Sequence, residues 1–290
     1  TPGAGAALRS AARRAAEAVR DAEALLVTAG AGIGVDSGLP DFRGTEGLWR
    51  EYPPLKRLRL NFSDMASPDW FERDPCFAWG FYGHRLLLYR RTEPHAGFGI
   101  LRRWASLAPS GHFVFTSNVD GQFQRAGFDD RSVCECHGSI HFIQGLAGGP
   151  TFPASSLELP EMDPATLRVE EVALPRIPGG ALARPNILMF GDWGWDGERT
   201  GQQKSLLTSW LGEVRRSGAR LVVVEMGAGE AVPTVRRTSE AAARDFGGQL
   251  VRINPRESEV PGRVEGISLA CGALEALSMI DAELQEPMAK

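Results

Sequence analysis

Apolar and polar residues alternate along this chain in the manner of an α/β protein. Six short, mostly apolar runs are typical of buried strands: residues 24–27, 113–116, 132–136, 186–190, 220–225 and 249–254. Longer segments repeat apolar side chains at helical spacing, and we expect helices at residues 6–22, 206–216, 233–246 and 272–284. Strands that alternate with helices predict a doubly wound, Rossmann-like parallel sheet.

Two stretches break this alternation. Residues 45–95 form short helical pieces rich in aromatic side chains, which predict a helical insertion that covers the preceding glycine-rich loop. Residues 141–184 are rich in proline, glycine and acidic side chains, a composition that favours a small second insertion or a flap. The Rossmann-like domain is then discontinuous and takes residues 1–44, 96–140 and 185–286.

The composition is that of an ordinary globular protein, with 43% hydrophobic and 23% charged residues. The formal net charge is −4 and no basic run exceeds a pair, which argues against a nucleic-acid partner held through its phosphates. No apolar stretch approaches the roughly 18 residues of a membrane span. The N-terminal residues lack an apolar signal core, and the four scattered cysteines form no disulfide framework, so we expect a cytoplasmic protein.

The loop after the first predicted strand has the most distinctive chemistry. Gly30, Gly32 and Gly34 permit close approaches that a Cβ would block, and a glycine-rich turn after a strand brings backbone N–H groups close to a phosphate. Pro40-Asp41-Phe42-Arg43 then places a carboxylate, an aromatic ring and a guanidinium in succession. This order favours a loop that encloses a ligand; the alternative is a surface turn with a buried Phe42.

Polar residues also follow other predicted strands. Asn118 and Asp120 come after residues 113–116, and His137 comes after residues 132–136. The carboxyl ends of parallel strands share one edge of the sheet, where open α/β sheets bind ligands. Asn and Asp are equally typical of strand-end turns, and a histidine beside a glycine is also typical of a capping or core residue. As a functional group, a histidine with a pKa of about 6.5 can accept a proton at neutral pH.

Taken in order, these segments resemble the sirtuin family of NAD-dependent protein deacylases. The resemblance covers nearly the whole chain and is carried by Gly30-Ala31-Gly32, residues 38–44, Thr116-Ser117-Asn118-Val119-Asp120, His137-Gly138, Phe190-Gly191-Asp192, Gly227-Ala228-Gly229 with Val232-Pro233, and Ile253-Asn254. A single glycine-rich loop would be weak support, whereas ordered matches at successive strand ends are specific.

The resemblance implies NAD as the cofactor and an acylated protein or peptide as the substrate, with nicotinamide and O-acyl-ADP-ribose as products. In sirtuins the acyl-lysine oxygen attacks the ribose carbon of NAD as nicotinamide departs, and a histidine then acts as a base on a ribose hydroxyl. His137 matches that base. Asn118 and Asp120 match the polar pair beside the nicotinamide and ribose, and Asn118 is assigned to catalysis with His137.

The resemblance also assigns binding residues. Those for NAD are Gly30, Ala31, Gly32, Ile33, Asp41, Phe42, Arg43, Ser117, Asn118, Asp120, Gly227, Ala228, Gly229, Asn254, Gly272 and Ala273. Phe190, Gly191 and Val232 match two edges between which a substrate peptide lies as an added strand. Tyr82 and Arg85 match a Tyr-x-x-Arg pair that grips the carboxylate of succinyl- or malonyl-lysine; the alternative is a pair spaced one helical turn apart for packing.

The chain departs from the family at its metal site. Sirtuins usually hold zinc with two Cys-x-x-Cys pairs after the catalytic histidine, but no cysteine lies between Cys136 and Cys271. Cys134 and Cys136 alone cannot complete a four-ligand site, so we predict packed thiols and no metal. Family side chains that hydrogen-bond the cofactor are also replaced, at Gly34, Ser117 and Ala228-Gly229.

These departures describe a divergent, bacterial-type member and leave other functions open. The same ribose chemistry with another nucleophile would make an ADP-ribosyltransferase or an NAD glycohydrolase. A third alternative is a non-catalytic sensor of NAD or ADP-ribose, although the chain retains His137, Asn118, Asp41 and Arg43. The main prediction is an NAD-dependent protein lysine deacylase, either a deacetylase or an enzyme acting on succinyl- or malonyl-lysine.

Overall fold

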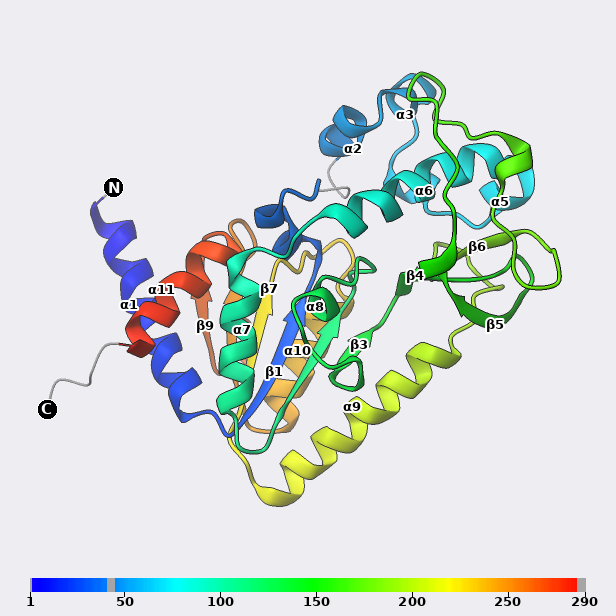
Figure 1. Ribbon diagram of the computed structural model, residues 1–290. Helices are drawn as coiled ribbons and strands as arrows, with labels where there is room; N and C mark the ends of the chain where they lie inside the picture. The colour runs from blue at the N-terminus through cyan, green and yellow to red at the C-terminus, as the bar shows by residue number, and fades with distance from the viewer. Residues whose placement is uncertain (1, 41–44, 286–290) are drawn as a thin grey trace, which may run out of the picture.

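A parallel sheet forms the centre of the larger part of the molecule (Figure 1). The computed structural model describes residues 2–40 and 45–285. Within them the sheet contains β1 (Ala24–Ala29), β2 (His112–Thr116), β3 (Val133–Glu135), β7 (Leu221–Met226), β8 (Gln249–Ile253) and β9 (Gly266–Leu269). The strands lie in the order β3-β2-β1-β7-β8-β9, and every neighbouring pair is parallel. The predicted α/β class and parallel sheet are confirmed.

Helices cover both faces of this sheet because the side chains of each strand alternate between two cores. Leu25 and Val27 of β1 face one core, which is covered by α1 (Pro2–Asp21), α7 (Ala96–Leu107) and α11 (Ala273–Gln285). Ala24 and Leu26 face the other core, which is covered by α9 (Glu198–Ser217) and α10 (Thr234–Asp245). Burial on both faces accounts for the nearly continuous apolar runs of these strands.

A helical module lies between β1 and α7 in the chain and at the far end of the molecule from α1 (Figure 1). Its helices are α2 (Thr45–Glu51), α3 (Pro53–Leu58), α4 (Phe62–Met65), α5 (Asp69–Arg73) and α6 (Pro75–Arg91). Pro75 occupies the first turn of α6, and Asn61 and Asp64 form a capping box on α4. The module and the neighbouring small domain share one hydrophobic core, and Gly80 of α6 lies directly against the Leu167 carbonyl.

A second, antiparallel sheet builds that small domain. It consists of β4 (Gly138–Gly145), β5 (Gly148–Pro153) and β6 (Ala183–Ile187), in the order β5-β4-β6. The prediction that residues 186–190 form a strand of the Rossmann-like domain is wrong, because only Asn186 and Ile187 are in a strand and that strand is β6. An apolar run shows that a segment is buried but does not show which sheet receives it.

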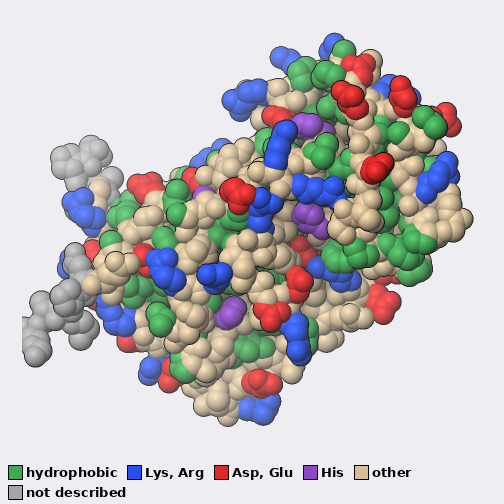
Figure 2. All heavy atoms as spheres, in the orientation of Figure 1, with side chains coloured by type: hydrophobic (Ala, Val, Ile, Leu, Met, Phe, Trp, Pro, Cys, Tyr) green, Lys and Arg blue, Asp and Glu red, His purple; other side chains and the backbone are tan. Residues whose placement is uncertain are grey.

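Short elements connect these layers. They are α8 (Gln122–Arg125) and the 3₁₀ helices η1 (Ala31–Ser37), η2 (Asp130–Ser132), η3 (Ala154–Ser156) and η4 (Glu171–Ala173). The face shown in Figure 2 mixes acidic and basic side chains without a large patch of one sign. Within the described residues, no helix combines the length and the apolarity needed to cross a membrane.

Candidate active site

The loops that follow β1, β2 and β7 meet at one edge of the main sheet. β1 pairs with β2 on one side and with β7 on the other, so the strand order reverses at this point. Open α/β sheets bind ligands at such a switch point, outside the carboxyl ends of their strands. Two cavities open there, and both include Ala31 of η1 in their walls.

Two glycine-rich loops pack against each other beside these cavities. The Gly32 amide donates to the Gly227 carbonyl at 3.1 Å. A Cβ on Gly30 would lie 2.6 Å from that carbonyl oxygen, and a Cβ on Gly32 would lie 2.6 Å from the Gly227 Cα. From the sequence, the glycines of the first loop are explained by the approach of a phosphate. In the structure, the contact between the two loops already requires glycine at these positions.

The first cavity, which we call the glycine-loop pocket, has a volume of about 450 Å³. Predicted NAD-binding residues in its lining are Ala31, Gly32, Gly227, Gly229, Asn254, Gly272 and Ala273. The Asn254 side chain organises this pocket: Oδ1 accepts bonds from the Arg256 and Glu257 amides at 3.0 and 2.9 Å, and Nδ2 donates to the Ala228 carbonyl at 3.0 Å. Asn254 therefore joins the loop after β8 to the loop after β7.

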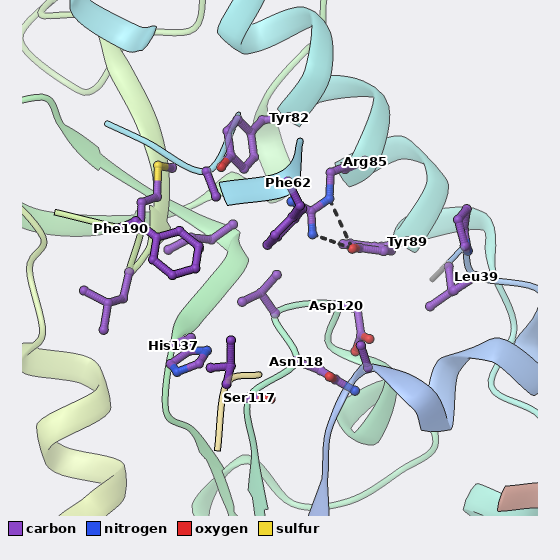
Figure 3. Close-up of a pocket in the computed structure, with 18 residues that line it drawn as sticks. Leu39, Phe62, Tyr82, Arg85, Tyr89, Ser117, Asn118, Asp120, His137 and Phe190 are labelled. Atoms are coloured by element: carbon purple, nitrogen blue, oxygen red, sulfur yellow. Dashed lines mark hydrogen bonds between the residues drawn. The ribbon is translucent and has the colours of Figure 1, made fainter. Parts of the chain in front are cut away.

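The second cavity, which we call the strand-end pocket, has a volume of about 280 Å³ (Figure 3). Its polar wall consists of Ser117, Asn118, Asp120 and His137 at the ends of β2 and β3. The facing wall comes from the helical module and consists of Phe62, Tyr82, Arg85 and Tyr89. The rest of the lining is largely apolar and includes Leu39, Ile187, Leu188, Met189, Phe190 and Val232.

Asn118 and Asp120 are held in place by hydrogen bonds to the backbone. The Asn118 Nδ2 donates to the Gly30 carbonyl at 3.1 Å and so connects the end of β2 to the glycine loop. The Asp120 Oδ1 accepts a bond from the Gln122 amide at 2.9 Å. Burial raises the pKa of Asp120 to about 6, although the Gln122 amide and the Arg85 guanidinium act in the opposite direction. Asn118 and Asp120 therefore stabilise the turn after β2 and also line the pocket.

His137 lies half-buried at the point where the chain leaves the main sheet for the small domain. Gly138 has a φ of +76°, and a Cβ there would collide with the Asn186 carbonyl. The His137 carbonyl accepts a bond from the Leu188 amide at 2.9 Å. These backbone constraints fix the position from which the imidazole reaches the strand-end pocket.

Arg85 is a buried guanidinium in the facing wall, with 6% of its surface exposed. Its Nε and Nη2 donate to the Tyr89 hydroxyl at 3.2 and 2.8 Å. The rings of Phe62 and Tyr82 have their centroids 5.7 and 5.6 Å from the Arg85 Cζ. Burial raises the pKa of Tyr82 to about 12, so its phenol remains a hydrogen-bond donor at neutral pH.

Tyr89 is a pocket residue that the sequence pattern did not single out. It lies four positions after Arg85 and seven after Tyr82, on the same face of α6, so its helical spacing was the signal available. Phe62 and Met189 also line the pocket without having been predicted. Both come from segments whose path relative to the sheet the sequence pattern does not define.

Some predicted site residues lie elsewhere. Gly30 and Ala228 belong to the contact between the two glycine-rich loops, and Ile33 is fully buried in the core of the main sheet. Gly191 is not part of either cavity lining, although its neighbour Phe190 is. Asp41, Phe42 and Arg43 lie outside the described residues.

The thiols of Cys134 and Cys136 are buried in the core beneath α9 and α10. Burial raises the pKa of Cys134 to about 12, which keeps this thiol protonated at neutral pH. In the part of the chain that the structure describes, no group of three or more His, Cys, Asp or Glu side chains is placed to hold a metal ion. The residues present therefore do not fit the zinc site of the family.

The chain matches a model of the Sir2 family over residues 30–199. An NAD-dependent protein deacylase of Aeropyrum pernix is 32% identical over 248 residues, which cover 85% of this chain and 86% of that protein. A second NAD-dependent protein deacylase, from Thermus thermophilus, is 29% identical over 267 residues, which cover 90% of this chain and 91% of that protein.

Solved structures extend the likeness to the fold. A Sir2 homologue in complex with NAD has a TM-score of 0.67 and 24% sequence identity, with 93% of both chains covered. A Sir2 variant with a deacetylated p53 peptide and 3′-O-acetyl ADP-ribose has a TM-score of 0.65 and 20% identity, with 93% of this chain and 97% of that chain covered. At these identities the likeness establishes the architecture of the two sheets.

Proposed function

The chain belongs to the Sir2 family and is an NAD-dependent protein deacylase, and we propose that its two cavities divide this reaction between them. In this proposal the glycine-loop pocket holds the adenosine end of NAD. The strand-end pocket holds the nicotinamide end and the acyl-lysine. The observation that carries the proposal is the position of His137, Asn118 and Asp120 in one cavity that shares Ala31 of its wall with the other.

The described residues fit an extended dinucleotide. The two cavities have volumes of about 450 and 280 Å³ and adjoin along the strand ends. A Cβ on Gly229 would have no neighbour closer than 3.4 Å, and a Cβ on Gly272 none closer than 3.7 Å, so both glycines leave space at the pocket wall. The cofactor-binding roles of Asp41, Phe42 and Arg43 stay predictions from the sequence, because these residues lie outside the described part of the chain.

When bound, NAD supplies an electrophilic ribose carbon as nicotinamide leaves, and a ribose hydroxyl that receives the acyl group. His137 then accepts the proton of that hydroxyl on an imidazole nitrogen. Asn118 orients the nicotinamide-ribose end of NAD, because its side-chain amide is already held in place by the Gly30 carbonyl. The apolar lining of the strand-end pocket keeps water from competing for the reactive carbon.

The substrate is an acylated protein segment, and we place it between Phe190-Gly191 and Val232. Phe190 and Val232 both line the strand-end pocket, and Phe190 has 50% of its surface exposed. An extended peptide can bind along such edges through its main chain while one side chain enters the pocket.

The four cysteines form no disulfide, which suits a reducing cytoplasm.

Succinyl- or malonyl-lysine is the acyl substrate that this pocket favours in our proposal. Arg85 supplies a buried positive charge, and the phenols of Tyr82 and Tyr89 lie on the same wall. An acyl carboxylate entering an apolar cavity needs such a partner, because its desolvation is otherwise costly. Tyr89 holds the guanidinium in place through two hydrogen bonds and acts as a positioning residue.

Mass spectrometry of the products tests the proposal. Purified protein with NAD and acetyl- or succinyl-lysine peptides is expected to yield nicotinamide and O-acyl-ADP-ribose. His137→Ala should abolish O-acyl-ADP-ribose, because the base acts after nicotinamide has left, while retaining NAD binding. A mass gain on the peptide would instead indicate ADP-ribosyl transfer, and free ADP-ribose with unchanged peptide would indicate NAD hydrolysis. Absence of nicotinamide release with every peptide would leave only a sensor role.

A further inference from the structure

Three exposed apolar side chains lie within six residues of the chain at the strand-end pocket. Leu188 and Phe190 line the pocket and have 37% and 50% of their surface exposed, and Trp193 has 98% exposed. Large apolar side chains left in water at one place commonly mark a binding surface. We call Leu188, Phe190 and Trp193 the apolar rim.

Trp193 differs sharply from the tryptophan two residues later. Trp195 packs inward: its ring atoms lie within 3.2 Å of the Cβ position of Gly138 and within 2.9 Å of that of Gly197. Its Nε1 is buried. Trp193, on the same loop, contributes almost none of its surface to the packing of the described residues. The fold therefore uses one of these tryptophans and leaves the other available for a partner.

The loop that carries Trp193 is held firmly on both sides of it. The Asp192 side chain is fully buried, and its Oδ2 accepts bonds from Arg184 Nη2 at 2.6 Å and from the Met189 amide at 3.2 Å. On the other side, Gln144 Nε2 donates to the Gly194 carbonyl at 2.7 Å. A side chain displayed from an anchored backbone loses less conformational entropy on binding than one on a mobile loop.

We propose that the apolar rim docks a large apolar side chain of the acylated protein segment, close in sequence to the acyl-lysine. This inference rests on the function proposed above and adds a sequence preference to it. Two of the three rim residues, Leu188 and Phe190, line the pocket proposed for the acyl-lysine, which identifies the substrate segment as the occupant of the rim. Tryptophan is enriched among the residues that dominate binding energy at protein interfaces.

The reach of the chain sets the position of that apolar residue. Trp193 is three residues from Phe190, so their Cα atoms are at most about 11 Å apart. An extended peptide covers the same span with about three residues. If the acyl-lysine enters the pocket beside Phe190, which lines it, the docked side chain lies within about three positions of that lysine.

Two peptide series and the variant Trp193→Ala test the proposal. In one series Leu or Trp occupies a position within three residues of the acyl-lysine, and in the other Gly and Ser occupy all flanking positions. The variant is expected to lower kcat/KM about tenfold on the apolar series, through KM with kcat unchanged, and to leave the Gly/Ser series nearly unaffected. Leu107→Ala is the control, because Leu107 is 77% exposed at the end of α7, before the N-terminal edge of β2.

Binding is measured alongside turnover, by fluorescence anisotropy of labelled peptides. If the wild-type protein binds the apolar series more tightly and Trp193→Ala loses that preference, the rim docks peptide even if no acyl group is removed; that result would separate this inference from the proposed function. Equal losses on both series, or no loss on either, would overturn it. So would sedimentation showing a wild-type dimer that Trp193→Ala converts to a monomer with unchanged peptide preference, since the rim would then join two copies of the chain.

Discussion

Two ionisable side chains of opposite sign lie buried in the strand-end pocket. Asp120 and Arg85 have 9% and 6% of their surfaces exposed. The guanidinium stays charged at every pH of interest, whereas burial raises the pKa of Asp120 to about 6. At neutral pH the Asp120 carboxylate is therefore ionised even though its burial disfavours the charge. Shifted pKa values of this kind are common at functional sites.

Asp120→Asn should be more stable than the wild-type protein at neutral pH. The native state holds the Asp120 proton up to a pKa of about 6, whereas in the unfolded chain the pKa is about 3.9. The native state therefore binds more protons in this interval, and stability falls as the pH rises through it. Between pH 5 and 7.5 this group lowers the free energy of unfolding by about 1 kcal/mol. Asp120→Asn removes that decrease.

Urea unfolding at the two pH values measures this difference. Asp245→Asn serves as the control, because that carboxylate is 47% exposed beside Arg244 on the surface. Its pH dependence should match that of the wild-type protein. The role given to Asp120 requires Asp120→Asn to lose deacylase activity as it gains stability. A variant with the wild-type pH dependence would contradict the raised pKa.

Arg85→Met should separate the two classes of acyl substrate. The change keeps an unbranched apolar stem but removes the charge that we place against the acyl carboxylate. We expect kcat/KM for a succinyl peptide to fall at least about tenfold, with a smaller change for an acetyl peptide. Tyr89→Phe, which removes the acceptor of two Arg85 hydrogen bonds, should produce a weaker loss of the same kind. Equal losses on both peptides would remove the carboxylate role from Arg85.

The connection between β3 and β4 determines where His137 lies. Gly138 has a φ of +76° and no room for a Cβ beside the Asn186 carbonyl. Gly138→Ala should therefore lower the free energy of unfolding by about 3 kcal/mol or more, from backbone strain and the collision together. Gly179→Ala is a matched control, because Gly179 has a φ of +98° but nothing within 4 Å of its Cβ position.

Thermal unfolding distinguishes the two contributions. Gly179→Ala should lose only the part due to backbone strain, on the order of 1 kcal/mol. If both variants lose the same stability, the steric contact at Gly138 is unimportant and the position of His137 is fixed in another way. If Gly138→Ala folds and binds NAD, its loss of turnover reports the displacement of the imidazole.

Helices and strands with a clear apolar pattern could be predicted from the sequence. Elements whose position depends on which other elements they pack against could not. β1 and β7 are mostly apolar and are buried on both faces, with Thr28 and Glu225 as their polar residues. The sequence therefore predicted both strands and the glycine-rich loops that follow them. β9 has four residues, Gly266–Leu269, of which Ser268 is exposed, so no strong pattern marks it. Residues 186–190 show how an apolar run can be assigned to the wrong sheet.

The residues of the candidate site also fall into those that the sequence predicted and those that it did not. Asn118, Asp120 and His137 were found because polar residues directly follow predicted strands, and the structure places all three in one cavity. Tyr89 and Phe62 reach that cavity from α6 and α4, whose approach to the sheet depends on packing of the helical module against the small domain. The local sequence around Tyr89 and Phe62 does not indicate how these helices pack against distant parts of the chain.

A buried polar cluster holds the small domain together. Gln144 is fully buried, and its Oε1 accepts bonds from Asn186 Nδ2 at 2.9 Å and from the Asp196 amide at 3.0 Å. The Arg184–Asp192 ion pair joins β6 to the loop that follows it, and both side chains are almost fully buried. These contacts join β4 and β6 to the loop that carries the apolar rim. If that rim binds substrate as proposed, loosening the small domain should weaken substrate binding.

Gln144→Leu should loosen this domain without disturbing the cofactor pocket. The change keeps a similar volume but leaves the half-buried Gly194 carbonyl and Asp196 amide without these partners, at a cost of about 2 kcal/mol. Hydrogen exchange is expected to increase in residues 188–196 while α11 remains protected, because the main sheet has its own cores. KM for acylated peptides should rise with little change in NAD affinity. An increase in exchange spread evenly over both sheets would show that the two parts unfold as one unit and that the cluster has no local role in presenting the apolar rim.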